Sequence, residues 1–228
     1  MYRRAASQRR CGRQKLRARG LVLPGYACTS QIWRSIRAEL DALYDITWVD
    51  WPCELTAEFH SIAAFAHWLR LAIQPAYYDF VIGHSLGGLV ALEAINRDRE
   101  LFRQVILVEA FLMSPPPFFR SLFLSPTLGQ DERLILDMME RERAHYSPRL
   151  RQALRQVDMS RLVASLSTKV QAFYGDRGCG EPHRVERELA WPGELQHRVQ
   201  VSVVSNAAHF PMIENPRMTT HLLHAILG

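Results

Sequence analysis

Cysteine is scarce in this 228-residue sequence, which has four, and no two of them stand at metal-ligand spacing. So few cysteines do not form a disulfide framework, and a reducing, cytoplasmic location is expected. Runs of about 18 apolar residues are also absent, which predicts no membrane span. We therefore expect neither a metal nor any other cofactor.

Acidic residues are missing from the first 20 positions, which contain eight of the 28 lysines and arginines. Residues 21–228 carry the other 20 against all 23 acidic residues, so the formal charge of +5 belongs to the tail. We interpret 1–20 as a basic, disordered tail. Such a tail can bind nucleic acid or an acidic membrane and resembles a transit peptide. No nucleic-acid partner is expected for the rest.

Short apolar runs alternate with longer amphipathic ones from residue 21 onward. With 48% hydrophobic residues, 21–228 is long enough for one domain with a full core. The β-α alternation predicts an α/β fold, a mostly parallel central sheet with helices on both faces. The predicted strands are 21–23, 46–49, 80–82, 105–108, 170–174 and 199–204, and the predicted helices are 32–43, 59–73, 86–95, 182–190 and 217–227.

The alternation breaks after Glu109, where three prolines at 115–117 exclude a helix or a central strand. Two helices are predicted next, 131–145 and 148–156, so residues at about 111–165 form a small helical cap above the sheet. Aromatic side chains gather at the start of the cap and either line an apolar substrate pocket or pack the cap onto the sheet. The candidates for substrate binding are Phe111, Phe118, Phe119 and Phe123.

The segment Gly83-His84-Ser85-Leu86-Gly87 fits the pattern G-x-S-x-G. It follows a predicted buried strand and precedes a predicted helix, which is the context that the motif requires. A tight strand-to-helix turn forces Ser85 into a strained conformation and exposes its hydroxyl at the sheet edge. The helix N-terminus favours negative charge there. The alternative is a serine that only caps the helix.

This elbow resembles that of the α/β-hydrolase superfamily, and the resemblance runs from about residue 21 to 227. The segment Leu21–Tyr26 is similar to the family's strand ending in His-Gly, with Pro24 in place of the usual histidine. The resemblance implies an oxyanion hole made by the amides of Tyr26 and Leu86. Ile32-Trp33 also resembles members that include esterases of pimeloyl-carrier-protein methyl esters.

A serine hydroxyl needs a base, and His209 lies in the loop after the last predicted strand, where the family places its catalytic histidine. His84, next to the serine, is expected to point elsewhere. Two residues are candidates for the acid of the triad, because Gly178 occupies the position where the family pattern has aspartate. Asp176 is one candidate. Glu109 is the other, since some relatives take their acid from the strand after the elbow helix.

The expected function is hydrolysis of a carboxylic ester or thioester by Ser85, His209 and one of these acids. The expected partner is a small-molecule ester or an acyl-carrier substrate, and the expected state is a monomer or homodimer. A carbon–carbon bond hydrolase with the same triad is an alternative. A ligand receptor without turnover is another, favoured by the missing acid at position 178.

Overall fold

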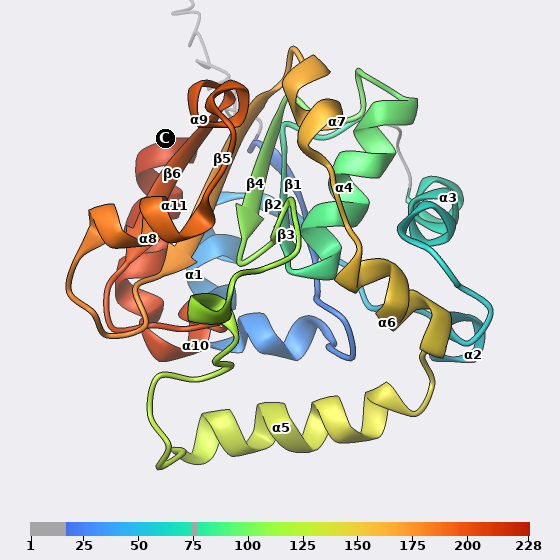
Figure 1. Ribbon diagram of the computed structural model, residues 1–228. Helices are drawn as coiled ribbons and strands as arrows, with labels where there is room; N and C mark the ends of the chain where they lie inside the picture. The colour runs from blue at the N-terminus through green and yellow to red at the C-terminus, as the bar shows by residue number, and fades with distance from the viewer. Residues whose placement is uncertain (1–16, 74–76) are drawn as a thin grey trace, which may run out of the picture.

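A six-stranded sheet forms the centre of the computed structural model, which describes residues 17–73 and 77–228 (Figure 1). Its strand order is β2-β1-β3-β4-β5-β6, and every neighbouring pair is parallel. The carboxyl ends of all strands therefore meet at one edge. The strands are β1 (Arg19–Leu23), β2 (Asp45–Trp48), β3 (Phe80–His84), β4 (Gln104–Val108), β5 (Lys169–Gly175) and β6 (Val199–Val204).

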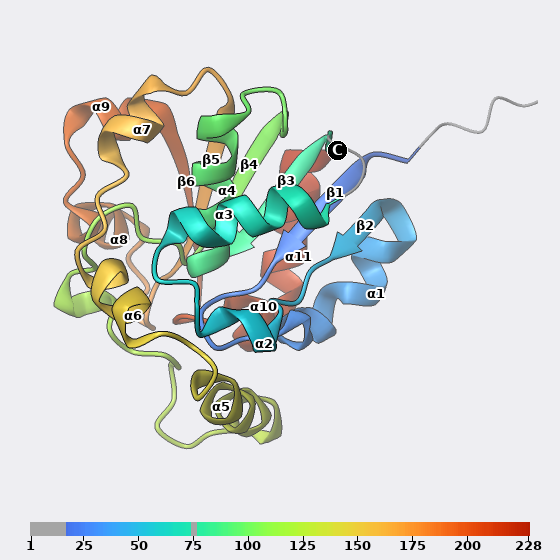
Figure 2. The ribbon, with the colours of Figure 1, turned by 90° about the vertical axis from the view of Figure 1, so that its right-hand side faces the viewer.

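Helices cover both faces of the sheet, which explains why its central strands are mostly apolar. On one face, α1 (Arg34–Leu43) packs against α11 (Pro216–Leu227). On the other, α3 (Ile62–Ala72) packs against α4 (Leu86–Arg97), and Figure 2 shows α3 crossing in front of the sheet. Because β3 and β4 lie between these layers, nearly all of their residues are buried. The α/β fold class predicted from the sequence is confirmed.

Further helices flank β5 and β6 and the start of the chain. The segment α9 (Gly193–Arg198) contacts both α7 (Ser160–Ser165) and β6. These elements are η1 (Ser30–Trp33), α2 (Cys53–Thr56), α7 (Ser160–Ser165), α8 (Pro182–Leu189), α9 and α10 (Pro211–Glu214).

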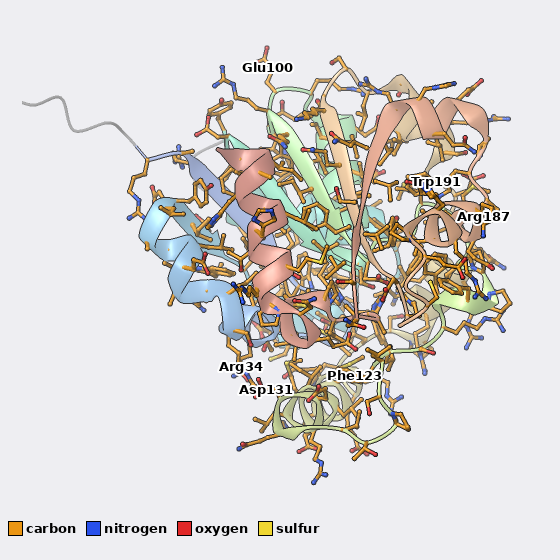
Figure 3. The ribbon with its side chains drawn as sticks, turned by 90° about the vertical axis from the view of Figure 1, so that its left-hand side faces the viewer. Arg34, Glu100, Phe123, Asp131, Arg187 and Trp191 are labelled. Atoms are coloured by element: carbon orange, nitrogen blue, oxygen red, sulfur yellow. The ribbon has the colours of Figure 1, made fainter. Side chains whose placement is uncertain are left out.

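A helical segment lies below the carboxyl edge of the sheet, between β4 and β5. It contains η2 (Pro117–Phe119), α5 (Gln130–Arg143) and α6 (Pro148–Arg155), and α5 runs along the bottom of the molecule in Figure 1. An ion pair joins Arg34 to Asp131 at the start of α5, as the labelled side chains in Figure 3 indicate. Both predicted cap helices are present.

The predicted tail falls largely on residues 1–16, outside the described residues. β1 begins at Arg19, ahead of the expected boundary at Leu21. No helix of the described residues is long and apolar enough to cross a membrane. The strand order changes direction between β1 and β3, and in open α/β sheets such a switch point is where ligands bind.

Candidate active site

Ser85 lies in the sharp turn between β3 and α4. Its backbone has φ 49° and ψ −117°, a conformation that L-residues rarely adopt. The turn is this tight because two glycines approach each other: a Cβ on Gly83 would lie 2.4 Å from the amide nitrogen of Gly88. The serine hydroxyl makes no capping hydrogen bond to α4. The side chain is therefore free for other chemistry.

The loop after β1 runs beside this turn, because Leu23 pairs with Gly83 in the sheet. The approach is close, since a Cβ on Gly87 would lie 2.6 Å from the carbonyl oxygen of Pro24. Among the described residues, the amides of Tyr26 and Leu86 donate no hydrogen bond to a protein acceptor. Two unused amides beside a serine are the donors that an oxyanion hole requires.

His209 is held by its backbone on both sides. Its amide donates to the carbonyl of Leu122 at 3.0 Å. The carboxylate of Glu214, at the end of α10, accepts hydrogen bonds from the flanking amides of Ala208 and Phe210, at 2.8 and 3.1 Å. Burial raises the pKa of Glu214, although these amide bonds oppose the shift. These hydrogen bonds therefore fix the backbone of the loop that carries the imidazole of His209.

The ring of His84 contacts the backbone of His209, and among the described residues no hydrogen bond joins it to Ser85. It is fully buried, and its Nε2 donates to the carbonyl oxygen of His209 at 2.8 Å. Trp33 from η1 packs edge-on against its ring, with the centroids 6.4 Å apart. Burial, with a smaller contribution from His209, holds the pKa of His84 well below its ordinary value. The neutral ring therefore fixes the backbone of the candidate base.

Of the two candidate acids, Glu109 is the one beside His209. Its Oε2 lies 3.3 Å from Nδ1 of the imidazole. The carboxylate of Asp176 instead accepts the amides of Gly178 and Gly180, at 2.8 and 3.3 Å, and closes its own loop. Gly178, where the family pattern has aspartate, has a φ of 69° that favours glycine.

Glu109 is also the partner of Arg177, whose Nη1 and Nη2 donate to its two carboxylate oxygens at 2.6 and 2.7 Å. Burial by itself raises the pKa of Glu109. The charge and hydrogen bonds of Arg177, followed by those of His209, outweigh burial and bring the pKa below its ordinary value. The acid is therefore ionised at neutral pH.

Ser85 and His209 line one cavity of about 260 Å³ between the sheet edge and the cap. Among the described residues, no hydrogen bond joins the side chains of Ser85 and His209. Arg120 is the one charged residue of a lining that is otherwise mostly apolar. The remaining lining residues are Leu86, Leu89, Phe111, Pro115, Phe119, Leu122, Leu154 and Val157.

Of the four phenylalanines proposed for substrate binding, two line the cavity and two do not. Phe111 and Phe119 line the cavity. Phe118 packs edge-on against Phe119, with the centroids 4.9 Å apart. Phe123 stacks on Phe210 at 5.1 Å, on the side facing α5 in Figure 3. Two of the four are therefore packing residues of the cap.

A second cavity, of about 620 Å³, lies beside α8, α9 and β6, where Arg187 and Trp191 are labelled in Figure 3. Its described lining contains neither serine nor cysteine. In residues 17–73 and 77–228, no cluster of three or more histidine, cysteine or acidic side chains is arranged to hold a metal ion. The cavity at Ser85 has both a serine and a histidine in its described lining.

The family described as "Alpha/beta hydrolase family" matches residues 21–220. The chain belongs to the α/β-hydrolase family. A comparison with curated proteins finds no significant match.

Solved structures similar to this α/β-hydrolase include carboxylesterase CesB from Bacillus subtilis, 15% identical with a TM-score of 0.66, covering 93% of this chain and 84% of that one. Esterase RhEst1 from Rhodococcus sp. is 18% identical with a TM-score of 0.62, over 92% and 90%. The 2-hydroxy-6-oxo-6-phenylhexa-2,4-dienoate hydrolase of a Rhodococcus strain is 14% identical with a TM-score of 0.61, over 92% and 90%. At these identities the likeness extends to the fold.

In this α/β-hydrolase, three residues around the site were missed by sequence reasoning. Arg177 binds Glu109, 68 positions away, which no local pattern reveals. Glu214 belongs to a segment that resembles the family, but its bond to the amide of Ala208 depends on how the loop folds. Arg120 follows the phenylalanine pair at 118–119 directly, so its neighbours were the available signal.

Proposed function

We propose that this α/β-hydrolase cleaves a carboxylic ester or thioester. Ser85 attacks the carbonyl carbon, and Nε2 of His209 takes the serine proton and then delivers it to the leaving group. The amides of Tyr26 and Leu86 stabilise the oxyanion. Water then attacks the acyl-serine with His209 as base, which releases the acid and restores the enzyme. Glu109 orients the imidazole and stabilises its charged form.

The observation that carries this proposal is the position of His209. Its Nδ1 faces the buried Glu109, which leaves Nε2 as the acceptor, and the ring lines the cavity that Ser85 also lines. A serine in a strained turn, free of capping bonds, shares the cavity with an imidazole that a carboxylate orients. This arrangement supports acyl transfer through the serine.

The substrate proposed is small, because the cavity measures about 260 Å³ and its walls are mostly apolar. Arg120 adds one cation to this lining. Together with the resemblance of Ile32-Trp33 to pimeloyl-ester esterases, this favours an acyl chain with a carboxylate at its far end. A methyl monoester of a dicarboxylic acid is therefore the first natural-type substrate to test.

The test combines a fluorophosphonate probe with hydrolysis of short p-nitrophenyl esters. We expect the wild type to be labelled and active, and Ser85→Ala to lose labelling and at least about 10³-fold in kcat. Two carboxylate-to-amide variants form a matched pair. Glu109→Gln should lower kcat by about 10²- to 10⁴-fold, and Asp176→Asn should stay within about tenfold of wild type.

Unchanged hydrolysis in Ser85→Ala would exclude the proposal. A wild type that binds esters without labelling or turnover would indicate a receptor. Labelling without ester turnover would direct attention to carbon–carbon bond hydrolysis by the same residues.

A further inference from the structure

The acid of the site is held by an unusually complete set of contacts. Arg177 and Glu109 form a two-pronged ion pair in which both side chains are nearly inaccessible, 6% and 0% exposed. The guanidinium also donates to the carbonyl of Gly175 at 2.9 Å and of Phe119 at 3.3 Å, and it lies 4.8 Å from the centre of the Phe119 ring. Arg177 thus connects the acid to the wall of the cavity.

These contacts determine which way the carboxylate faces. Oε1 accepts from the amide of Gly175 at 2.6 Å and from Nη1 of Arg177. Oε2 is shared between Nη2 of Arg177 and Nδ1 of His209. A carboxylate held at both oxygens cannot rotate away, so Oε2 stays directed at the imidazole. A lysine, with one point of charge, cannot hold both oxygens in the same way.

The same ion pair changes the charge that the imidazole meets. A lone carboxylate stabilises the imidazolium strongly, whereas a carboxylate paired with a guanidinium stabilises it less, because the two opposite charges partly cancel. Other charged or titratable groups near His209 come from three more elements. His84 at the end of β3 is neutral through burial, Glu214 of α10 binds the flanking amides, and Arg120 after η2 is exposed. Glu109 contacts the ring directly, and Arg177 acts on the ring through Glu109.

The loop after β5 explains how the arginine reached this position. It carries Gly178 where the family pattern has an acid, and it supplies Arg177 in the left-handed conformation, with φ 52°. This loop, with glycine at position 178, thus provides the cation that binds Glu109 from the end of β4.

We infer that Arg177 is a positioning residue for the proposed hydrolysis: its two-pronged contact fixes Glu109 against His209 and offsets part of the negative charge that faces the imidazole. The inference rests on the proposed function, because it concerns the base of that reaction.

Two variants separate geometry from charge, measured by kcat/KM for a short p-nitrophenyl ester between pH 5 and 9. Arg177→Met should move the acidic limb of the profile upward by about one pH unit and lower kcat about tenfold or more. Arg177→Lys keeps the positive charge, so it should lower kcat while the acidic limb of the pH profile stays at its wild-type position. Arg184→Met is the matched control, because Arg184 lies over the Phe118 ring and does not contact the acid.

A profile and kcat for Arg177→Met that equal those of wild type and of Arg184→Met would overturn the inference. If Arg177→Met does not fold, the double variant Glu109→Gln/Arg177→Met removes both buried charges, and Arg177→Lys alone carries the kinetic test. A wild-type kcat in Arg177→Lys would then count against positioning.

A readout independent of activity separates this inference from the proposed function. We expect a downfield proton NMR signal for the Nδ1–H of His209 in wild type, and its loss in both Glu109→Gln and Arg177→Met. If the wild type is neither labelled nor active, the hydrolase proposal fails, while loss of the signal in Arg177→Met still supports positioning of Glu109. A signal unchanged in Arg177→Met overturns it whatever the activity.

Discussion

Replacing Ser85 by glycine should make the protein more stable while abolishing its proposed activity. The backbone at this position, φ 49° and ψ −117°, is strained for any residue that carries a Cβ. Such strain costs about 1–3 kcal/mol. Glycine removes it but adds about 0.5–1 kcal/mol of unfolded-chain entropy. The free energy of unfolding should therefore rise by about 1 kcal/mol, which for a domain of this size raises the Tm by about 2–4 °C.

The comparison that isolates this strain is Ser85→Gly against Ser85→Ala, because both lack the hydroxyl and only the alanine keeps the Cβ. Urea unfolding followed by circular dichroism measures both free energies, and equal m-values show that the unfolded states are comparable. Ala190→Gly serves as a reference, since Ala190 has an ordinary left-handed conformation at the end of α8. A Ser85→Gly protein no more stable than Ser85→Ala would refute the argument that the elbow stores strain.

Three further predictions concern charge and protonation. Because the pKa of His84 is depressed in the folded state, the free energy of unfolding of the wild type should fall by up to about 1.4 kcal/mol per pH unit as pH drops below about 6.5. Urea titrations should show a smaller slope for His84→Gln, and equal slopes would contradict this prediction. The depressed pKa of Glu109 predicts a separate loss of stability as pH falls below about 4.3, weaker in Glu109→Gln by thermal unfolding. Arg120→Ala should lower kcat/KM about tenfold for a dicarboxylic monoester but leave a neutral ester of equal length within about twofold, with the exposed Arg217→Ala as control; equal losses on both esters would exclude anion recognition.

The sheet and its main helices were predictable because each depends on a local pattern. Apolar runs such as 105–108 are long enough to read as buried strands, and 131–145 shows the helical period over several turns. The helices that were missed, α2, α7, α9 and α10, have four to six residues, so none completes two turns. Their presence depends on packing against elements distant in the sequence.

The candidate site was predictable to the same extent. Ser85 was a candidate because its motif lies between a predicted strand and a predicted helix, which is a local context. The acid was not, because the choice between Glu109 and Asp176 depends on a contact 100 positions away, at His209. The orientation of His84 likewise follows from where the last loop crosses the elbow. Such pairings are set by the folded sheet edge.

The direction of β1 has a practical consequence. All six strands are parallel, so Arg19 enters the sheet at the edge opposite to Ser85 and the cap. A surface support or fusion partner attached ahead of β1 would therefore meet the molecule on its far side. Immobilisation through that end should leave the mouth of the cavity open to dissolved esters.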